Sequence, residues 1–191
     1  MNWFENLLIV AGIGLDIFAT MEIQGSMIAQ VKKKALIIAF AVVAGLQLFF
    51  YLVGYNVFRL LGVYGYIKQG EKYGQIVAVI VFGLLGVRLL VKAIKREIIQ
   101  ERRRDQIRVW DYIRIITVTS LYTLAAGSVC GLLGTTIWQL ILLVLIVSVV
   151  EVVGGIYTGL HFGFENKTLA YVIGAILLLF VGFEIFCTRV L

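Results

Sequence analysis

Six long apolar runs, separated by short polar or basic segments, dominate the hydrophobic pattern of this chain. A helix needs about 20 apolar residues to cross a bilayer, and each run reaches that length. Strands would show alternating ten-residue segments, and lipid forces every backbone amide to bond within its own helix, so the runs predict helices. We therefore expect an all-α integral membrane protein with six transmembrane helices, over residues 4–24, 35–58, 75–95, 113–132, 136–158 and 168–187.

The first and fourth runs depart from a purely apolar pattern. The first carries Glu5 and Asp16 and lacks a basic start, so it does not resemble a cleavable signal peptide. The fourth is the least apolar, because it contains several hydroxyl residues: Thr117, Thr119, Ser120, Tyr122, Thr123 and Ser128.

Composition agrees with a lipid environment and excludes several classes of protein. The chain is 61% hydrophobic and 15% charged, whereas soluble domains are near 45–50% apolar and 25% charged. A soluble enzyme and a disordered chain are therefore excluded. The only cysteines, Cys130 and Cys187, stand singly without the Cys-x-x-Cys spacing of redox thiols, which argues against a thiol carrier.

Basic residues predict the orientation of the chain. Most of them, Lys92 included, lie in or beside the links after the first, third and fifth runs, and the positive-inside rule places those links in the cytoplasm. Both termini would then lie outside a cell membrane. The basic segment between Lys95 and Arg108 adjoins a span, so it predicts contact with anionic lipid rather than with nucleic acid.

The two halves of the chain resemble each other. Residues 14–19 and 120–125 share Leu and Ala at an offset of 106, and Gly25 and Gly131 match at the same offset. Gln47 precedes Gly54 in the second run, much as Glu151 precedes Gly159 in the fifth. Coincidence among abundant residues is the alternative. We interpret the chain as one membrane domain, with repeat 1 over about 1–95, a basic linker over about 96–112 and repeat 2 over about 113–191. Three helices per half would make the repeat inverted, as in many transporters.

Polar residues inside the spans are candidates for function, because a charge at the bilayer centre costs at least about 2.5–3.5 kcal/mol. Carboxylate, amide and hydroxyl oxygens suit hard divalent cations such as Mn²⁺ or Mg²⁺. A salt bridge between Asp16 and Arg88 is the structural alternative. Near the cytoplasmic end of the first run, we expect Glu22 to reach water. The candidate ion pathway is Asp16, Thr20, Gln47, Ser120, Tyr122 and Glu151, and the other intramembrane charges are Arg88 and Glu184.

Glycines form a second pattern, since small residues let membrane helices approach closely. Either packing or hinge motion would use them, and they permit a homodimer without requiring one. The candidates are Gly25, Gly86, Gly131 and Gly155.

Two motifs resemble those of a known family. The stretch Gly12-Ile13-Gly14-Leu15-Asp16-Ile17-Phe18-Ala19 resembles the glycine–Asp–Phe–Ala motif of the manganese efflux pumps (MntP-like), which belong with the LysE-type exporters. Thr119-Ser120-Leu121-Tyr122 is similar to the second motif of that family, Thr-Ser-Leu-Asp, with Tyr122 in place of the aspartate. Gln47 likewise stands where the family usually has a glutamate, and residues 83–88 resemble the family's third-helix pattern.

The resemblance implies export of Mn²⁺ as a transported substrate, with Asp16 handling the ion and no permanently bound cofactor. Glu151 could restore one of the two missing carboxylates. No nucleotide-binding loop is present, so we expect secondary transport by alternating access and no enzymatic activity. Two alternatives stay open: export of an amino acid or other small organic solute, and a degenerate membrane protein that no longer transports.

Overall fold

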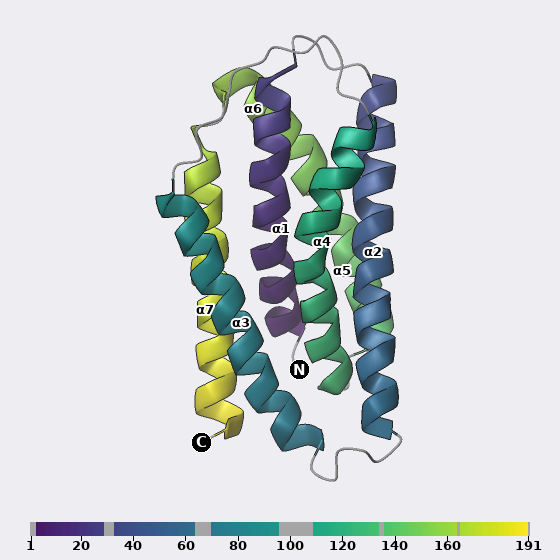
Figure 1. Cartoon of the computed structure of the whole chain (residues 1–191), viewed down its shortest axis with the longest axis vertical. Helices are drawn as coiled ribbons and strands as arrows, with labels where there is room; N and C mark the ends of the chain where they lie inside the picture. Colours follow the sequence, from purple (N-terminus) through teal and green to yellow (C-terminus); the bar gives the residue numbers. More distant parts are fainter. Residues whose placement is uncertain are drawn as a thin grey trace.

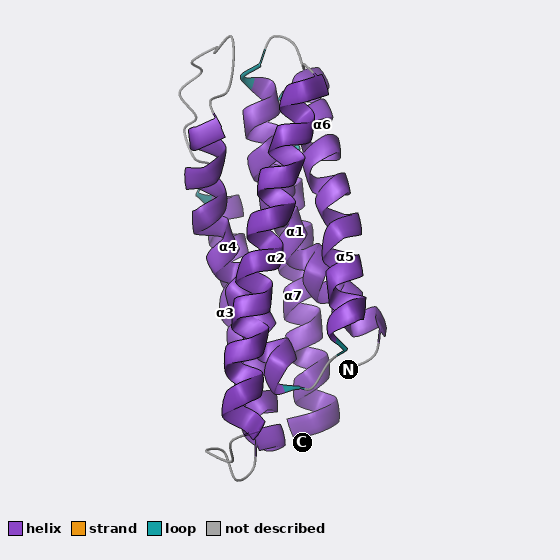
Figure 2. Ribbon diagram, turned by 90° about the vertical axis from the view of Figure 1, so that its right-hand side faces the viewer, coloured by secondary structure: helices purple, strands orange, loops and turns teal. Residues whose placement is uncertain are grey.

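Long helices running along one axis make up the protein (Figure 1). The computed structural model describes residues 3–28, 33–63, 70–95, 109–133, 136–163 and 165–190. Figure 2 shows no strand among these residues. The prediction of an all-α integral membrane protein is confirmed.

Each predicted apolar run forms one long helical segment, called a rod below. The first four rods are α1 (Trp3–Ser26), α2 (Lys33–Val63), α3 (Gly70–Ile94) and α4 (Val109–Leu132). The fifth consists of α5 (Ile137–Val149), the π-helix η1 (Val150–Gly154) and α6 (Gly155–Phe162), and the sixth consists of α7 (Lys167–Ile185) and the π-helix η2 (Phe186–Val190). Five of the rods, all but α4, are identified as long and apolar enough to cross a membrane. Most of the expected linker lies outside the described residues, and its last part, 109–112, is helical in α4.

The central positions of the bundle belong to α1 and α4, which lie side by side and run in opposite directions (Figure 1). α1 contacts α4, α7 and the rod formed by α5, η1 and α6, whereas α4 packs mainly against α2 and α3. The most apolar window of α1 is 61% buried, compared with 28% in α2 and in α3. A polar side chain on α1 is therefore surrounded by protein rather than by lipid.

Glycines allow the central helices to touch their neighbours backbone to backbone. A Cβ atom on Gly131 of α4 would overlap the main chain of Tyr55 in α2. In the same way, a Cβ atom on Gly25 of α1 would overlap the main chain of Ile156 in α6. The structure also places Gly155 against α1 and Gly86 against Leu179 of α7. All four candidate glycines thus lie at helix contacts.

The contact between α2 and α4 and the contact between α6 and α1 have the same register. A Cβ on Gly54 would meet the carbonyl oxygen of Leu124 and, at 2.9 Å, the amide nitrogen of Ser128. A Cβ on Gly155 would meet the carbonyl oxygen of Phe18 at 2.7 Å and the amide nitrogen of Glu22 at 3.3 Å. Leu124 and Ser128 follow Phe18 and Glu22 by 106 positions, which is the offset between the two sequence motifs.

The two chain ends lie toward the same end of the bundle (Figure 1). There the guanidinium of Arg189 in η2 donates to both carboxylate oxygens of Glu5 in α1, at 3.0 and 2.9 Å. The ends of α1 and η2 are thereby tied together.

Substitution of the contact glycines should separate packing from helix propensity. We expect Gly131→Ala and Gly25→Ala each to destabilise the protein by about 1–3 kcal/mol, because the added methyl group overlaps a backbone. Gly45→Ala and Gly83→Ala are matched controls, since a Cβ at either position meets nothing within 4 Å. Thermal unfolding in detergent measures the difference. Equal stabilities of the contact and control variants would contradict this account of the packing.

Candidate functional site

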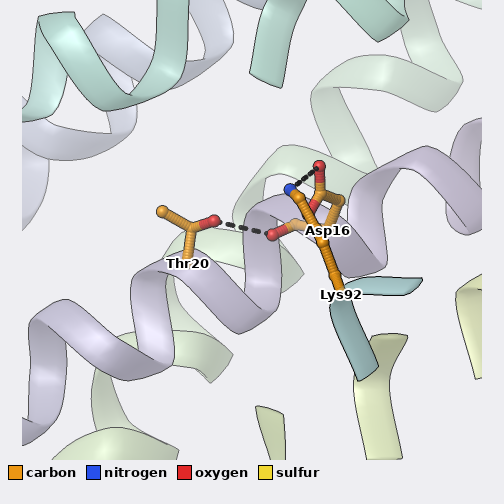
Figure 3. Close-up of polar contacts among 3 residues, drawn as sticks. All are labelled: Asp16, Thr20 and Lys92. Atoms are coloured by element: carbon orange, nitrogen blue, oxygen red, sulfur yellow. Dashed lines mark hydrogen bonds and ion pairs between the residues drawn. The ribbon is translucent and has the colours of Figure 1, made fainter. Parts of the chain in front are cut away.

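Asp16 forms a buried ion pair across the bundle. Its carboxylate accepts hydrogen bonds from the ammonium of Lys92 in α3, at 2.7 Å to Oδ1 and 3.0 Å to Oδ2 (Figure 3). The Asp16 side chain is 1% exposed and that of Lys92 is 24% exposed. The pair therefore neutralises a carboxylate that lies near the middle of the central helix.

Thr20 lies one turn after Asp16, as its spacing predicts, but its hydroxyl hydrogen-bonds to the backbone. Thr20 Oγ1 donates to the main-chain oxygen of Asp16 at 2.8 Å (Figure 3). This bond is the common way for a buried helical threonine to satisfy its hydroxyl.

Two tyrosine rings surround the cations beside Asp16. The guanidinium of Arg88 lies 4.4 Å from the ring centroid of Tyr122, and the ammonium of Lys92 lies 5.5 Å from the rings of both Tyr122 and Tyr171. These separations allow cation–π attraction, which strengthens as the cation loses water. Among the described residues Asp16 pairs with Lys92, while Arg88 stacks on Tyr122, so the salt bridge between Asp16 and Arg88 that was the structural alternative does not form there.

The same residues line a pocket between α1, α3, α4 and α7. Its polar members are one carboxylate, two cations and one phenol, and the rest are aliphatic. The oxygen of Tyr122 is buried with no hydrogen-bond partner among the described residues. The pocket thus offers both a negative group and positive groups to a ligand; its lining is Ile13, Asp16, Leu85, Arg88, Leu89, Lys92, Tyr122 and Leu178.

Gln47 and Glu151 meet in a second polar cluster. Gln47 Nε2 donates to Glu151 Oε2 at 2.8 Å. The Ser148 hydroxyl lies within hydrogen-bonding distance of both Gln47 Oε1 and the main-chain oxygen of Val144, and its single proton is donated to one of the two at a time. Gly14 makes room for the Glu151 carboxylate, because a Cβ there would overlap its oxygen. Gly14 and Asp16 are two helical positions apart, about 200° around α1. The two clusters therefore adjoin different sides of the same helix.

Glu151 lies in the π-helix η1. Such segments are rare and occur often at functional sites, because the widened turn redirects the side chains within it. Here the π-helix carries a carboxyl side chain that is 2% exposed. Sequence spacing alone would not have identified this turn.

The remaining predicted residues have different surroundings. Ser120 of α4 is fully buried, and its hydroxyl has no hydrogen-bond partner among the described residues. Glu184 lies near the end of α7, partly exposed and away from both clusters. Within the described residues, no group of three or more His, Cys, Asp or Glu side chains is arranged to hold a metal ion.

The sequence analysis did not identify three of these residues. Lys92 was counted only as a topology signal, although it lies four positions after Arg88 and therefore on the same helix face. Ser148 interrupts an apolar run three positions before Glu151, and that break was a usable signal. Tyr171 had no distinguishing pattern, because it occurs among other apolar residues.

The expectation that the Glu22 side chain reaches water is wrong. The residue is 0% exposed. Its Oε1 accepts a hydrogen bond of 3.0 Å from the backbone N–H of Asn166, immediately before α7. Glu22 therefore joins the end of α1 to the start of α7.

A double-mutant cycle on Asp16 and Lys92 tests whether they interact. We expect Asp16→Asn and Lys92→Met each to lower the unfolding free energy by about 2–3 kcal/mol, because each removes one side of the ion pair inside the bundle. The double variant should lose less than the sum of the two. Unfolding in detergent measures the coupling, and strict additivity would show that the contact contributes no stability.

A separate substitution tests the contact between α1 and α7. Glu22→Ala should cost about 1–3 kcal/mol, because the Asn166 amide loses its acceptor. Glu165→Ala is the control, since Glu165 is exposed at the same end of the bundle. Thermal unfolding compares the two variants, and a loss no greater than that of the control would be inconsistent with the buried contact.

Comparison with known proteins agrees with the motifs. The family model described as "Putative manganese efflux pump" matches residues 8–186. A "Putative manganese efflux pump MntP" of Clostridium perfringens strain SM101 is 24% identical, over 91% of this chain and 89% of the relative. The protein of the same description from strain 13 is 23% identical over the same shares. No solved structure matches the chain significantly. Since the family model covers nearly the whole sequence, this multi-pass membrane protein belongs to the manganese efflux pump family.

Proposed function

We propose that this chain is a secondary transporter, not an enzyme, that exports a divalent cation, Mn²⁺ in the first instance, across the cell membrane. The observation that carries the proposal is the Asp16 carboxylate, which is 1% exposed and lines a pocket beside the central helix. An ionised group in such a place costs free energy, so it is a candidate for a functional role. Membership of the family supplies the class of cargo.

Oxygen atoms near Asp16 could complete the coordination of the ion. Glu151 supplies a second carboxylate on another side of α1, and Gln47 supplies an amide oxygen next to it. Ser120 and Tyr122 carry buried hydroxyl oxygens without partners among the described residues. The helices would have to shift to bring the two carboxylates to one ion. Such a site is looser than one with paired aspartates, so we expect weak binding, which suits an ion that must also be released.

Alternating access would follow from two related halves of the bundle. The antiparallel arrangement of α1 and α4 and the common register of their glycine contacts support an inverted repeat. In this arrangement Gly54 corresponds to Gly155, and not to Gly159 as the sequence pattern suggested. Halves related in this way can rock about an ion held between them. The basic links would lie in the cytoplasm and both termini outside.

A second candidate cargo is a small zwitterionic solute. One observation favours it: the guanidinium of Arg88 lines the pocket without a carboxylate partner among the described residues, while Asp16 lines the same pocket. A carboxylate of the solute would bind Arg88, and its ammonium would bind Asp16.

Ligand-dependent stability distinguishes these proposals. Specific binding stabilises a protein by RT ln(1 + [L]/Kd), so a site with Kd near 0.1 mM gives about 2 kcal/mol at a few millimolar ligand. We expect Mn²⁺ to raise the unfolding temperature of the wild type in detergent and to do so much less for Asp16→Asn. Glu184→Gln removes the same charge away from the pocket, so it should respond as the wild type does. Uptake of Mn²⁺ into everted vesicles should follow the same order.

The other outcomes identify the alternatives. A shift with amino acids but with no metal ion would favour the zwitterionic cargo. A Mn²⁺ shift that persists in Asp16→Asn would remove Asp16 from the site. No shift with any of these ligands would indicate a member of the family that no longer transports.

A further inference from the structure

The ammonium of Lys92 has the surroundings of a bound cation. Both carboxylate oxygens of Asp16 lie within 3.0 Å of it, and the faces of Tyr122 and Tyr171 flank it at 5.5 Å. Carboxylates and aromatic faces are the groups that bind ammonium ions in proteins. A side chain of the protein itself thus provides a positive charge at Asp16.

We propose that Lys92 is a tethered cation that occupies Asp16 when no cargo is bound, and that the transported cation must displace it. This inference rests on the proposed function, because it concerns the same carboxylate. It adds a competitor to the site: Lys92 and the metal ion bind Asp16 in turn, and each occupant neutralises the buried charge.

Competition follows from the geometry of the pair. Lys92 uses both oxygens of Asp16, so a metal ion that coordinates this carboxylate must take over at least one of them. A divalent ion and an ammonium that shared the carboxylate would also repel each other strongly in a medium of low dielectric constant. The two occupied states are therefore mutually exclusive.

The displaced ammonium has a route out of the site. Lys92 lies in the last turn of α3, which ends at Ile94, and its side chain is 24% exposed. A lysine has a flexible four-carbon stem, and near a helix end it can extend to the membrane surface. Arg88 is less suited to this exchange, because its guanidinium stacks on Tyr122 rather than on Asp16.

The alternative is a permanent structural ion pair, and the two roles predict opposite effects on metal binding. If Lys92 competes, then removing its charge should strengthen binding of Mn²⁺ at Asp16. If Lys92 only holds Asp16 in place, its removal should leave the affinity unchanged or weaken it.

The experiment is a calorimetric titration of Mn²⁺ into the detergent-purified full chain. We expect Lys92→Met to lower the Kd for Mn²⁺ at least tenfold relative to the wild type. Lys95→Met is the matched control, because Lys95 is exposed just beyond the same helix and has no ion pair among the described residues, and it should bind as the wild type does. Lys92→Gln keeps a hydrogen-bond donor beside Asp16 without the charge. It should show the same gain, and it replaces Lys92→Met if that variant does not fold.

Several outcomes separate this inference from the proposed function. An unchanged or raised Kd in both Lys92 variants overturns the tethered cation, while Asp16-dependent binding by the wild type would still support the transporter. Binding by Lys92→Met but not by the wild type supports the competitor and argues against Mn²⁺ as cargo. Tight binding that survives Asp16→Asn in the Lys92→Met background overturns both, as does the absence of binding in every variant.

A second measurement follows the displacement itself. Labelling of Lys92 by a neutral amine-reactive reagent, read by mass spectrometry, should increase when Mn²⁺ is added to the wild type. It should not respond to Mn²⁺ in Asp16→Asn. Labelling that is insensitive to Mn²⁺ in the wild type would contradict displacement.

Discussion

Direct contact between helix backbones at glycines determines where the other elements of this bundle can lie. Gly25 and Gly155 bring α1 and α6 together, and Gly131 and Gly54 do the same for α4 and α2. Successive residues in a helix point about 100° apart, so a contact of this kind fixes the rotation of a helix as well as its distance. The direction in which Asp16 points is thus set by contacts at other positions of α1, from Phe18 to Gly25. Gly14 extends the principle to the site, because it makes room for the carboxylate of Glu151.

Charge balance makes the polar interior tolerable. Asp16 and Glu151 supply carboxyl groups, and Lys92 and Arg88 carry positive charge, on helices that cross the apolar part of the bundle. Only Asp16 and Lys92 form a close ion pair among these four, whereas Arg88 lies on an aromatic face and Glu151 on an amide. The protein therefore accommodates these four side chains in three different ways. The guanidinium of Arg88 and the carboxyl group of Glu151 have no close counter-ion among the described residues, so each can still bind a ligand.

Hydropathy predicted the spans because burial in lipid imposes a strong and local requirement on composition. Asp16 could be identified for the same reason, since a carboxylate in mid-span is costly. The pairing of Lys92 with Asp16 was not predicted, and the expectation that Glu22 reaches water was wrong, because a long side chain near a helix end can turn outward or inward. The neighbouring helices decide which, and these are distant in sequence: Asp16 is 76 positions from Lys92, and Glu22 is 144 positions from Asn166. The π-helix around Glu151 could not be predicted from the sequence either, because it results from how the whole helix packs and not from any single residue in it.

The ion pair at Asp16 also has an electrical consequence. A single unpaired charge that moves across a membrane potential of 100 mV changes in energy by about 2.3 kcal/mol. The ammonium of Lys92 offsets the charge of the carboxylate, so the two side chains together add no net charge. If the bundle moves as proposed for transport, the membrane voltage would therefore do no net work on this ion pair while the site is unloaded.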